Sequence, residues 1–140
     1  MGWTGIVYFI CFGIVSVSLW WWIEKRRIQN HQSKLSKLRP NLSDDDFIKY
    51  FSDRGIRNDV TIWILNQIGS YKYMELKIHW DDELWDFYRI DGEELEDIFN
   101  LAFEAFAIPK PVRYKPLEIP TLHTVEDLII YLNGQVQNFS

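Results

Sequence analysis

The sequence predicts an all-α protein in which one N-terminal transmembrane helix precedes a small helical bundle. An apolar run of 21 residues without a charge extends from Trp3 to Ile23, and the later segments show helical apolar spacing after capping residues. One segment, near residues 71–80, has the period of a strand instead, so an α+β arrangement with a short hairpin there is the alternative. With 140 residues, 47% of them hydrophobic, the chain has room for an anchor and one small domain.

Residues 1–23 are predicted to form the transmembrane helix, with residues 3–23 in contact with lipid. At about 1.5 Å per residue this run is about 30 Å long, which matches the hydrocarbon core of a bilayer. Aromatic and basic side chains typical of a membrane interface follow at its end: Trp20, Trp21, Trp22, Lys25, Arg26 and Arg27. The alternative, a cleaved signal peptide, requires a charged n-region and a small-residue cleavage site, which this run lacks.

No basic residue precedes the apolar run, so the positive-inside rule places the N-terminus outside and the C-terminal domain in the cytoplasm. Residues 24–42 are predicted to be a basic juxtamembrane linker; residues 24–40 carry a net charge of +5, which attracts an anionic leaflet. Residues 41–108 carry a net charge of −10, which disfavours nucleic-acid binding and favours a basic protein partner.

The helical domain is predicted over residues 43–135, with a tail at 136–140. Its first helix begins after the cap Ser43, carries three aspartates in its first turn, and can end at Gly55. A second helix is predicted from Asp59 through Ile68. The apolar positions of these two helices are Phe47, Tyr50, Phe51, Val60, Ile64 and Ile68.

The segment from Met74 to Trp80 alternates apolar and polar residues, with His79 on its polar face. Because one strand without a partner is unstable, we expect an extended connection lying on the core.

The clearest helix is predicted from Gly92 to Phe106, with Asp91 and Glu94 as a capping box. The prolines between Ile108 and Pro120 predict a loop, and a last helix begins at Thr124 and stops at Gly134. The apolar stripes of these two helices are Leu95, Ile98, Phe99, Ala102 and Phe106, followed by Val125, Leu128, Ile129 and Leu132.

Three segments together resemble an acyl carrier protein. Residues 84–95, with Asp91-Gly92-Glu93-Glu94, look like the stretch in which an Asp-Ser-Leu tripeptide opens the second carrier helix. Residues 102–108 resemble the end of that helix, and residues 123–132 are similar to the final carrier helix. The Asp-Gly followed by two acids resembles a bacterial family of carrier-like domains, the domain of unknown function 1493. The resemblance implies a bacterial protein, and with the apolar run it places the chain in the inner (plasma) membrane.

The chain departs from carriers at the residue that matters most for their activity. Gly92 stands where carriers attach phosphopantetheine to a serine, and no Ser, Thr or Cys occurs from Tyr71 to Pro120. We therefore expect no cofactor. The resemblance also implies docking of a basic partner through carboxylates of the second helix, at Glu93, Glu96, Asp97 and Glu104. The alternative is that these side chains form the ordinary solvated face of an amphipathic helix.

No motif for catalysis or metal binding is present. The acidic segment 80–86 lacks the graded spacing and glycine turn of a calcium loop, and capping or solvation explains its acids. The three histidines have no ligand partners at metal spacing. We expect a membrane-anchored, non-enzymatic interaction or regulatory module. The alternatives are an accessory or decoy carrier in acyl or lipid metabolism, and a small membrane-bound immunity or inhibitor protein.

Overall fold

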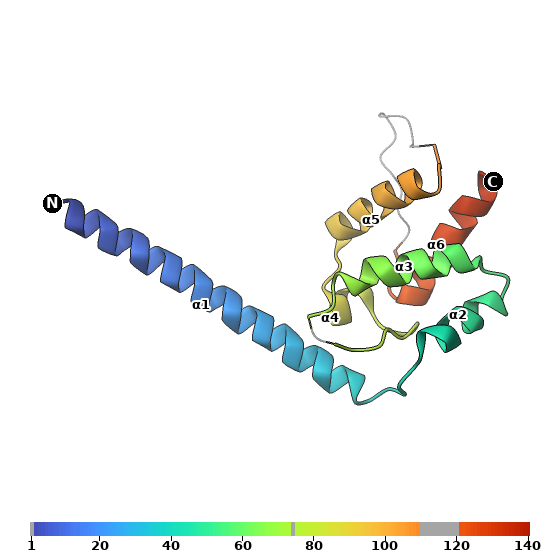
Figure 1. The fold of residues 1–140 in the computed structure, drawn as a ribbon, viewed down its shortest axis with the longest axis horizontal. Helices are drawn as coiled ribbons and strands as arrows, with labels where there is room; N and C mark the ends of the chain where they lie inside the picture. The colour runs from blue at the N-terminus through green and yellow to red at the C-terminus, as the bar shows by residue number, and fades with distance from the viewer. Residues whose placement is uncertain (1, 74, 110–120) are drawn as a thin grey trace.

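The computed structural model describes residues 2–73, 75–109 and 121–140, and its ordered elements over these residues are all helices (Figure 1). The described part of the chain contains no strand, only an isolated bridge between Glu83 and Thr124. The all-α prediction is confirmed, and the α+β alternative is not needed. The helices are α1 (Trp3–Ser36), α2 (Asp44–Ser52), α3 (Asn58–Gly69), α4 (Leu84–Tyr88), α5 (Gly92–Ala105) and α6 (Val125–Asn138).

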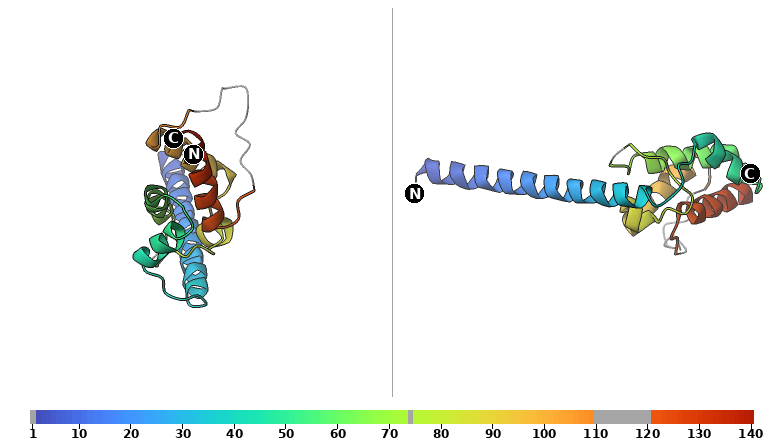
Figure 2. Two further views of the ribbon diagram at one scale, coloured as in Figure 1. Left: turned by 90° about the vertical axis from the view of Figure 1, so that its right-hand side faces the viewer. Right: turned by 90° about the horizontal axis from the view of Figure 1, so that it is seen from below.

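Helix α1 is a single element of 34 residues. Its apolar N-terminal half extends away from the other helices, whereas its C-terminal turns lie against them (Figures 1 and 2). Its length and composition suit a helix that crosses a membrane. None of its most apolar stretch is buried within the protein.

The residues predicted as a juxtamembrane linker are helical through Ser36. Ile28 and Gln32 are buried, and Leu35 is partly buried, which places the three residues on one face at i, i+4 and i+7. This face packs against α4. The last turns of α1 are therefore part of the folded domain rather than a free connection.

Local capping explains where the domain helices begin. The Ser43 hydroxyl accepts a hydrogen bond from the N–H at the third position of α2. Asp91 and Glu94 form the predicted capping box of α5, and Thr124 and Asp127 form a second one at α6. Each satisfies backbone N–H groups that a helix start leaves without partners.

The core lies where α3 packs against α2 and α6, with α5 covering it. The apolar residues predicted for these helices are buried, except Tyr50 and Phe106, which are partly buried. The turn after α2 passes through Gly55, whose φ of 77° lies in the left-handed region that glycine adopts without strain.

Several boundaries differ from the prediction. The second helix begins at Asn58, and α4 was not predicted. Helix α6 continues past Gly134 to Asn138 because Val136 packs into the core, so the predicted tail begins inside a helix. Most of the predicted proline loop, residues 110–120, lies outside the described residues.

The segment after α3 is an extended connection, as predicted, with Leu76 and Ile78 buried against the core. Met74 lies outside the described residues. The prediction for His79 was wrong: its side chain is buried, with 7% of the residue exposed, because the chain turns there and its backbone N–H bonds Asp82.

Candidate functional site

The outer face of α5 carries the four carboxylates that the sequence singled out. Glu93, Glu96, Asp97 and Glu104 are all exposed. The opposite side of α5 holds the buried stripe that begins with Leu95, and the Asp91 cap fixes its first turn. The structure therefore brings the four acids together on one surface of a well-anchored helix.

An apolar side chain that the sequence did not single out lies among these acids. Leu101 is 50% exposed, four residues after Asp97 and three before Glu104. Residues at this spacing are neighbours on a helix surface. The sequence could have indicated an exposed leucine here, because Leu101 lies outside the apolar stripe of α5. We name Glu93, Glu96, Asp97, Leu101 and Glu104 the outer α5 surface.

The electrostatics near this surface are visible at Tyr71. Burial raises the pKa of the Tyr71 hydroxyl, and the charges of Glu94, Asp97 and Asp91 raise it further. A negative potential that opposes ionisation of a tyrosine also attracts a cationic group. The first turns of α5 therefore carry a negative potential.

Gly92 occupies the first position of α5, where the resemblance places the carrier serine. A Cβ built on Gly92 meets no heavy atom within 4 Å, so a serine would fit there. Glycine is thus not required by packing at this position, and its lack of a side chain leaves no hydroxyl there.

The second notable region is the junction between α1 and the domain. Gln32 is fully buried; its side chain donates to the Phe87 carbonyl at 2.9 Å and accepts from the Tyr73 N–H at 3.2 Å. His31 Nε2 lies 3.2 Å from an Asp86 carboxylate oxygen. The Gln29 amide donates to the Tyr73 carbonyl at 2.7 Å. These contacts join α1 to both the 71–73 turn and α4.

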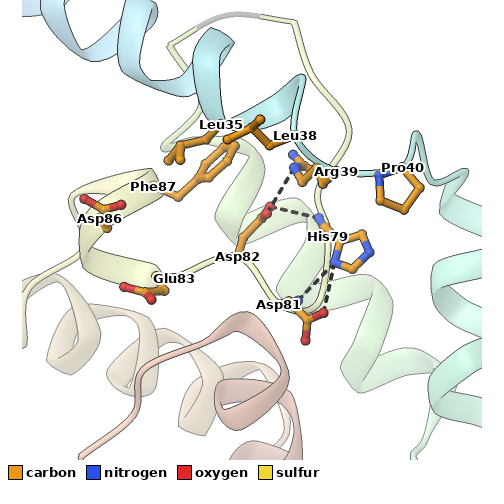
Figure 3. Close-up of a pocket in the computed structure, with 10 residues that line it drawn as sticks. All are labelled: Leu35, Leu38, Arg39, Pro40, His79, Asp81, Asp82, Glu83, Asp86 and Phe87. Carbon is orange, nitrogen blue, oxygen red and sulfur yellow. Dashed lines mark hydrogen bonds and ion pairs between the residues drawn. The ribbon is translucent and has the colours of Figure 1, made fainter.

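A cavity of about 310 Å³ lies at the end of this junction, between residues 35–40 at the C-terminal end of α1 and residues 79–87 (Figure 3). Arg39 enters it from one side and Asp82 from the other, with Arg39 Nε 3.2 Å from Asp82 Oδ1. That contact has ion-pair geometry, and the Nε–H makes no hydrogen bond within the described structure. The Arg39 guanidinium also donates to the Lys77 carbonyl and lies 4.9 Å from the Phe87 ring centre.

Asp82 is the most enclosed acid of this cavity, with 5% of the residue exposed. Burial raises the pKa of its carboxyl, although hydrogen bonds from Tyr88 and the His79 N–H and the Arg39 charge all act in the opposite direction. Burial also raises the pKa of the Tyr88 hydroxyl, and the neighbouring Asp82 charge adds to this effect. Both groups keep their protons more firmly than in water.

The polar side chains around Asp82 bond to one another, as in a cluster that stabilises the fold. Asp82 Oδ2 accepts from the Tyr88 hydroxyl at 2.5 Å and the His79 N–H at 2.9 Å, while Oδ1 faces Arg39. These partners occupy the carboxylate oxygens. Among the residues that the structure describes, no group of three or more His, Cys, Asp or Glu side chains could hold a metal ion.

The predicted interface residues lie on α1 next to its apolar part. Trp20, Trp21 and Trp22 are exposed, and the Lys25 ammonium lies 5.2 Å from the Trp21 ring centre. The Arg26 guanidinium lies 5.0 Å from the Trp22 ring centre, and Arg27 is exposed beside Glu24. Such pairs are cation–π contacts that keep basic groups beside the indole rings.

Sequence reasoning did not identify Gln32, Arg39 and Asp82 as site residues, because each bonds to residues remote in the chain.

Comparison of this chain with family models, with curated proteins and with solved structures gave no match.

Proposed function

We propose that this protein is a membrane-anchored, non-enzymatic interaction module that presents the outer α5 surface to a basic protein partner. In this proposal α1 crosses a bacterial inner membrane once, with its N-terminus outside, and the domain lies in the cytoplasm. The domain acts by recruiting or regulating the partner, without phosphopantetheine.

One observation carries the proposal: the helix that holds the apolar run packs its C-terminal turns against the acidic domain. Gln32 lies in the same helix as the apolar run, yet it is fully buried against α4 and the 71–73 turn. A cytoplasmic domain on a flexible tether would sample many orientations, whereas this one is held in a defined orientation to α1. Such an arrangement favours a role in which one surface must face a partner at the membrane.

The chemistry of the outer α5 surface supports a protein as the partner. Carboxylates around a half-exposed leucine offer charge steering together with an apolar contact, a combination typical of protein interfaces. The acidic surface would repel nucleic-acid phosphates.

The decoy-carrier alternative is favoured by one specific feature. Gly92 follows the Asp91 cap at the start of α5, as the carrier resemblance requires, but it has no attachment group. In that case the partner would be an enzyme that normally docks acyl carriers, and the same surface would bind it.

The test is affinity capture from detergent-solubilised membranes, with the full chain as bait. Glu96→Lys combined with Asp97→Lys should reduce the captured partner, and the wild-type yield should fall as salt is raised. The matched control is Asp53→Lys with Glu75→Lys, which changes the net charge equally at exposed positions away from α5. Equal loss in both double variants, or loss in neither, would reject the outer α5 surface as the binding site.

A further inference from the structure

Two oppositely charged surfaces lie on elements of this chain that are joined by packing between α1 and α4. One is the outer α5 surface, and the other is the basic segment Lys25–Arg27 of α1. The contacts of Gln32 hold the C-terminal turns of α1 on the domain, and Arg39, just after the helix, pairs with Asp82. The positions of the two surfaces relative to the membrane are therefore set together.

Figure 1 shows how these surfaces lie along α1. Helix α5 is on the side of the domain that is turned toward the N-terminal half of α1, so it lies nearer the apolar run than α2 does. Lys25–Arg27 follow directly after that run. Both surfaces thus belong to the membrane-proximal part of the molecule.

Resting on the proposed function, we propose that the basic partner of the outer α5 surface is the Lys25–Arg27 segment of a second copy of this chain. In two copies inserted in the same direction, the outer α5 surface of one copy and the Lys25–Arg27 segment of the other both lie on the membrane-proximal side. Contact between α5 of one copy and α1 of the other brings opposite charges together. The reciprocal contact forms by the same two-fold operation, so the interface closes as a dimer.

Charge and accessibility favour the Lys25–Arg27 segment of a second copy as the partner. Arg27 has a side chain that is 77% exposed, and Arg26 is exposed as well. Residues 24–40 carry a net charge of +5 and residues 41–108 one of −10, so each copy supplies both halves of a complementary pair. Confinement to one membrane raises the effective concentration of the second copy. Leu101 can cover the alkyl stems of the facing basic side chains.

The first test is cross-linking between differently tagged copies of the full chain in proteoliposomes, with Cys11→Ala in both. One copy carries Glu96→Cys and the other Arg26→Cys, so a product can form only between copies. A short bis-maleimide should give a mixed dimer whose yield falls at high salt. The matched control replaces Glu96→Cys by Asp53→Cys. Asp53 is also exposed but lies at the C-terminal end of α2, so this pair should give at most a background yield.

The second test exchanges the charges. Set one is Glu96→Lys with Asp97→Lys, and set two is Arg26→Glu with Arg27→Glu. Each set alone should reduce dimers at least fivefold, measured by energy transfer between labelled copies, because both contacts then join like charges. A mixture of the two sets should restore dimers, since both contacts again join opposite charges. Protease protection is checked first, and only preparations with the wild-type orientation are compared.

The outcomes separate this inference from the proposed function. Cross-linking and restoration in the mixture support a homotypic dimer. No mixed dimer, with capture of another membrane protein still lost in Glu96→Lys/Asp97→Lys, overturns the second copy as partner and leaves the proposed function in place. No mixed dimer and unchanged capture overturn both.

Discussion

The side-chain amide of Gln32 donates to the backbone carbonyl of Phe87, which lies 55 positions later in the chain, at 2.9 Å. Gln32 belongs to the helix that carries the apolar run, and Phe87 belongs to α4. This bond and the one from the Tyr73 N–H fill a fully buried polar position. A buried glutamine without these partners would be costly, so the contact specifies how α1 sits on the domain.

Replacing Gln32→Leu should therefore destabilise the domain. The Phe87 carbonyl would remain buried without its donor, and such a group costs about 1–3 kcal/mol. Thermal unfolding of the full chain in detergent micelles, followed by circular dichroism, measures the effect. The control is Lys34→Ala on an exposed position of the same helix, which should stay within about 0.5 kcal/mol of wild type. A Gln32→Leu protein as stable as this control would contradict a structural role for the junction.

The Arg39–Asp82 pair should control stability and its pH dependence. Arg39→Met leaves a buried carboxylate without its cation, a change that typically costs about 3–5 kcal/mol. Burial already raises the folded pKa of Asp82 above 3.8, and losing Arg39 raises it further. Between the unfolded and folded pKa values the folded state holds more protons, so stability falls as pH rises through that window. The free energy of unfolding lost in Arg39→Met should be smallest near about pH 4 and larger at neutral pH.

Adding Asp82→Asn to Arg39→Met removes the buried charge together with its partner. We expect this double variant to recover part of the lost stability at neutral pH and to lose the pH dependence that Asp82 causes. A double-mutant cycle measures this coupling. It compares the melting temperatures of the wild type, both single variants and the double variant from acidic to neutral pH. Strict additivity of the two single changes would mean that the charges do not interact.

The residues that were predicted correctly depend on neighbours close in sequence. Ser43, Asp91 and Thr124 cap helices because their partners lie within three positions, and apolar spacing then orients each helix. The four exposed α5 acids, Glu93, Glu96, Asp97 and Glu104, follow from the same period.

The features that could not be predicted depend on remote packing. Gln32 and Asp82 look like ordinary surface residues until Phe87 and Arg39 cover them, and α4, with 5 residues, is too short to show a helical period. Gly134 did not end α6, since Val136 gains more by packing in the core than the helix loses at a glycine.

The proposed orientation of the chain predicts on which side of the membrane its C-terminus lies. A reporter fused after Ser140 should be cytoplasmic, because Lys25, Arg26 and Arg27 flank only the C-terminal side of the apolar run. Alkaline phosphatase at that site should be inactive, whereas a fluorescent protein that folds only in the cytoplasm should be bright. The reverse pattern would place the domain outside and contradict the proposed orientation.

Gly92 predicts that the chain does not accept a phosphopantetheine arm. Incubation with a phosphopantetheinyl transferase and coenzyme A should leave the intact mass unchanged, and a genuine acyl carrier serves as the positive control. Gly92→Ser should fold normally, because a Cβ there meets no heavy atom within 4 Å. We expect it to remain unmodified as well, since Glu93 stands where carriers have leucine. A mass gain in the wild type would overturn the proposal of a carrier-like domain without the arm.

The acids and the leucine of the outer α5 surface should contribute differently to binding. Glu96→Lys with Asp97→Lys should slow association and reverse much of its salt dependence, because these charges steer the partner before contact. Leu101→Ala should leave the association rate within about threefold and speed dissociation, since an apolar contact forms only after docking. Surface plasmon resonance at low and high salt, with the second copy or a captured partner in nanodiscs, separates the two rates.

Folding should survive both changes, since Glu96, Asp97 and Leu101 point away from the buried stripe of α5. Lysines near the helix start lose a favourable dipole interaction of only about 0.3–1 kcal/mol. Circular dichroism is the control, and Ile130→Ala on α6 is the matched apolar change, because Ile130 is also 50% exposed. If Leu101→Ala and Ile130→Ala accelerate dissociation equally, the effect is not local to α5. If neither the charges nor Leu101 alter either rate in folded protein, the acids of α5 are its solvated face and the partner binds elsewhere.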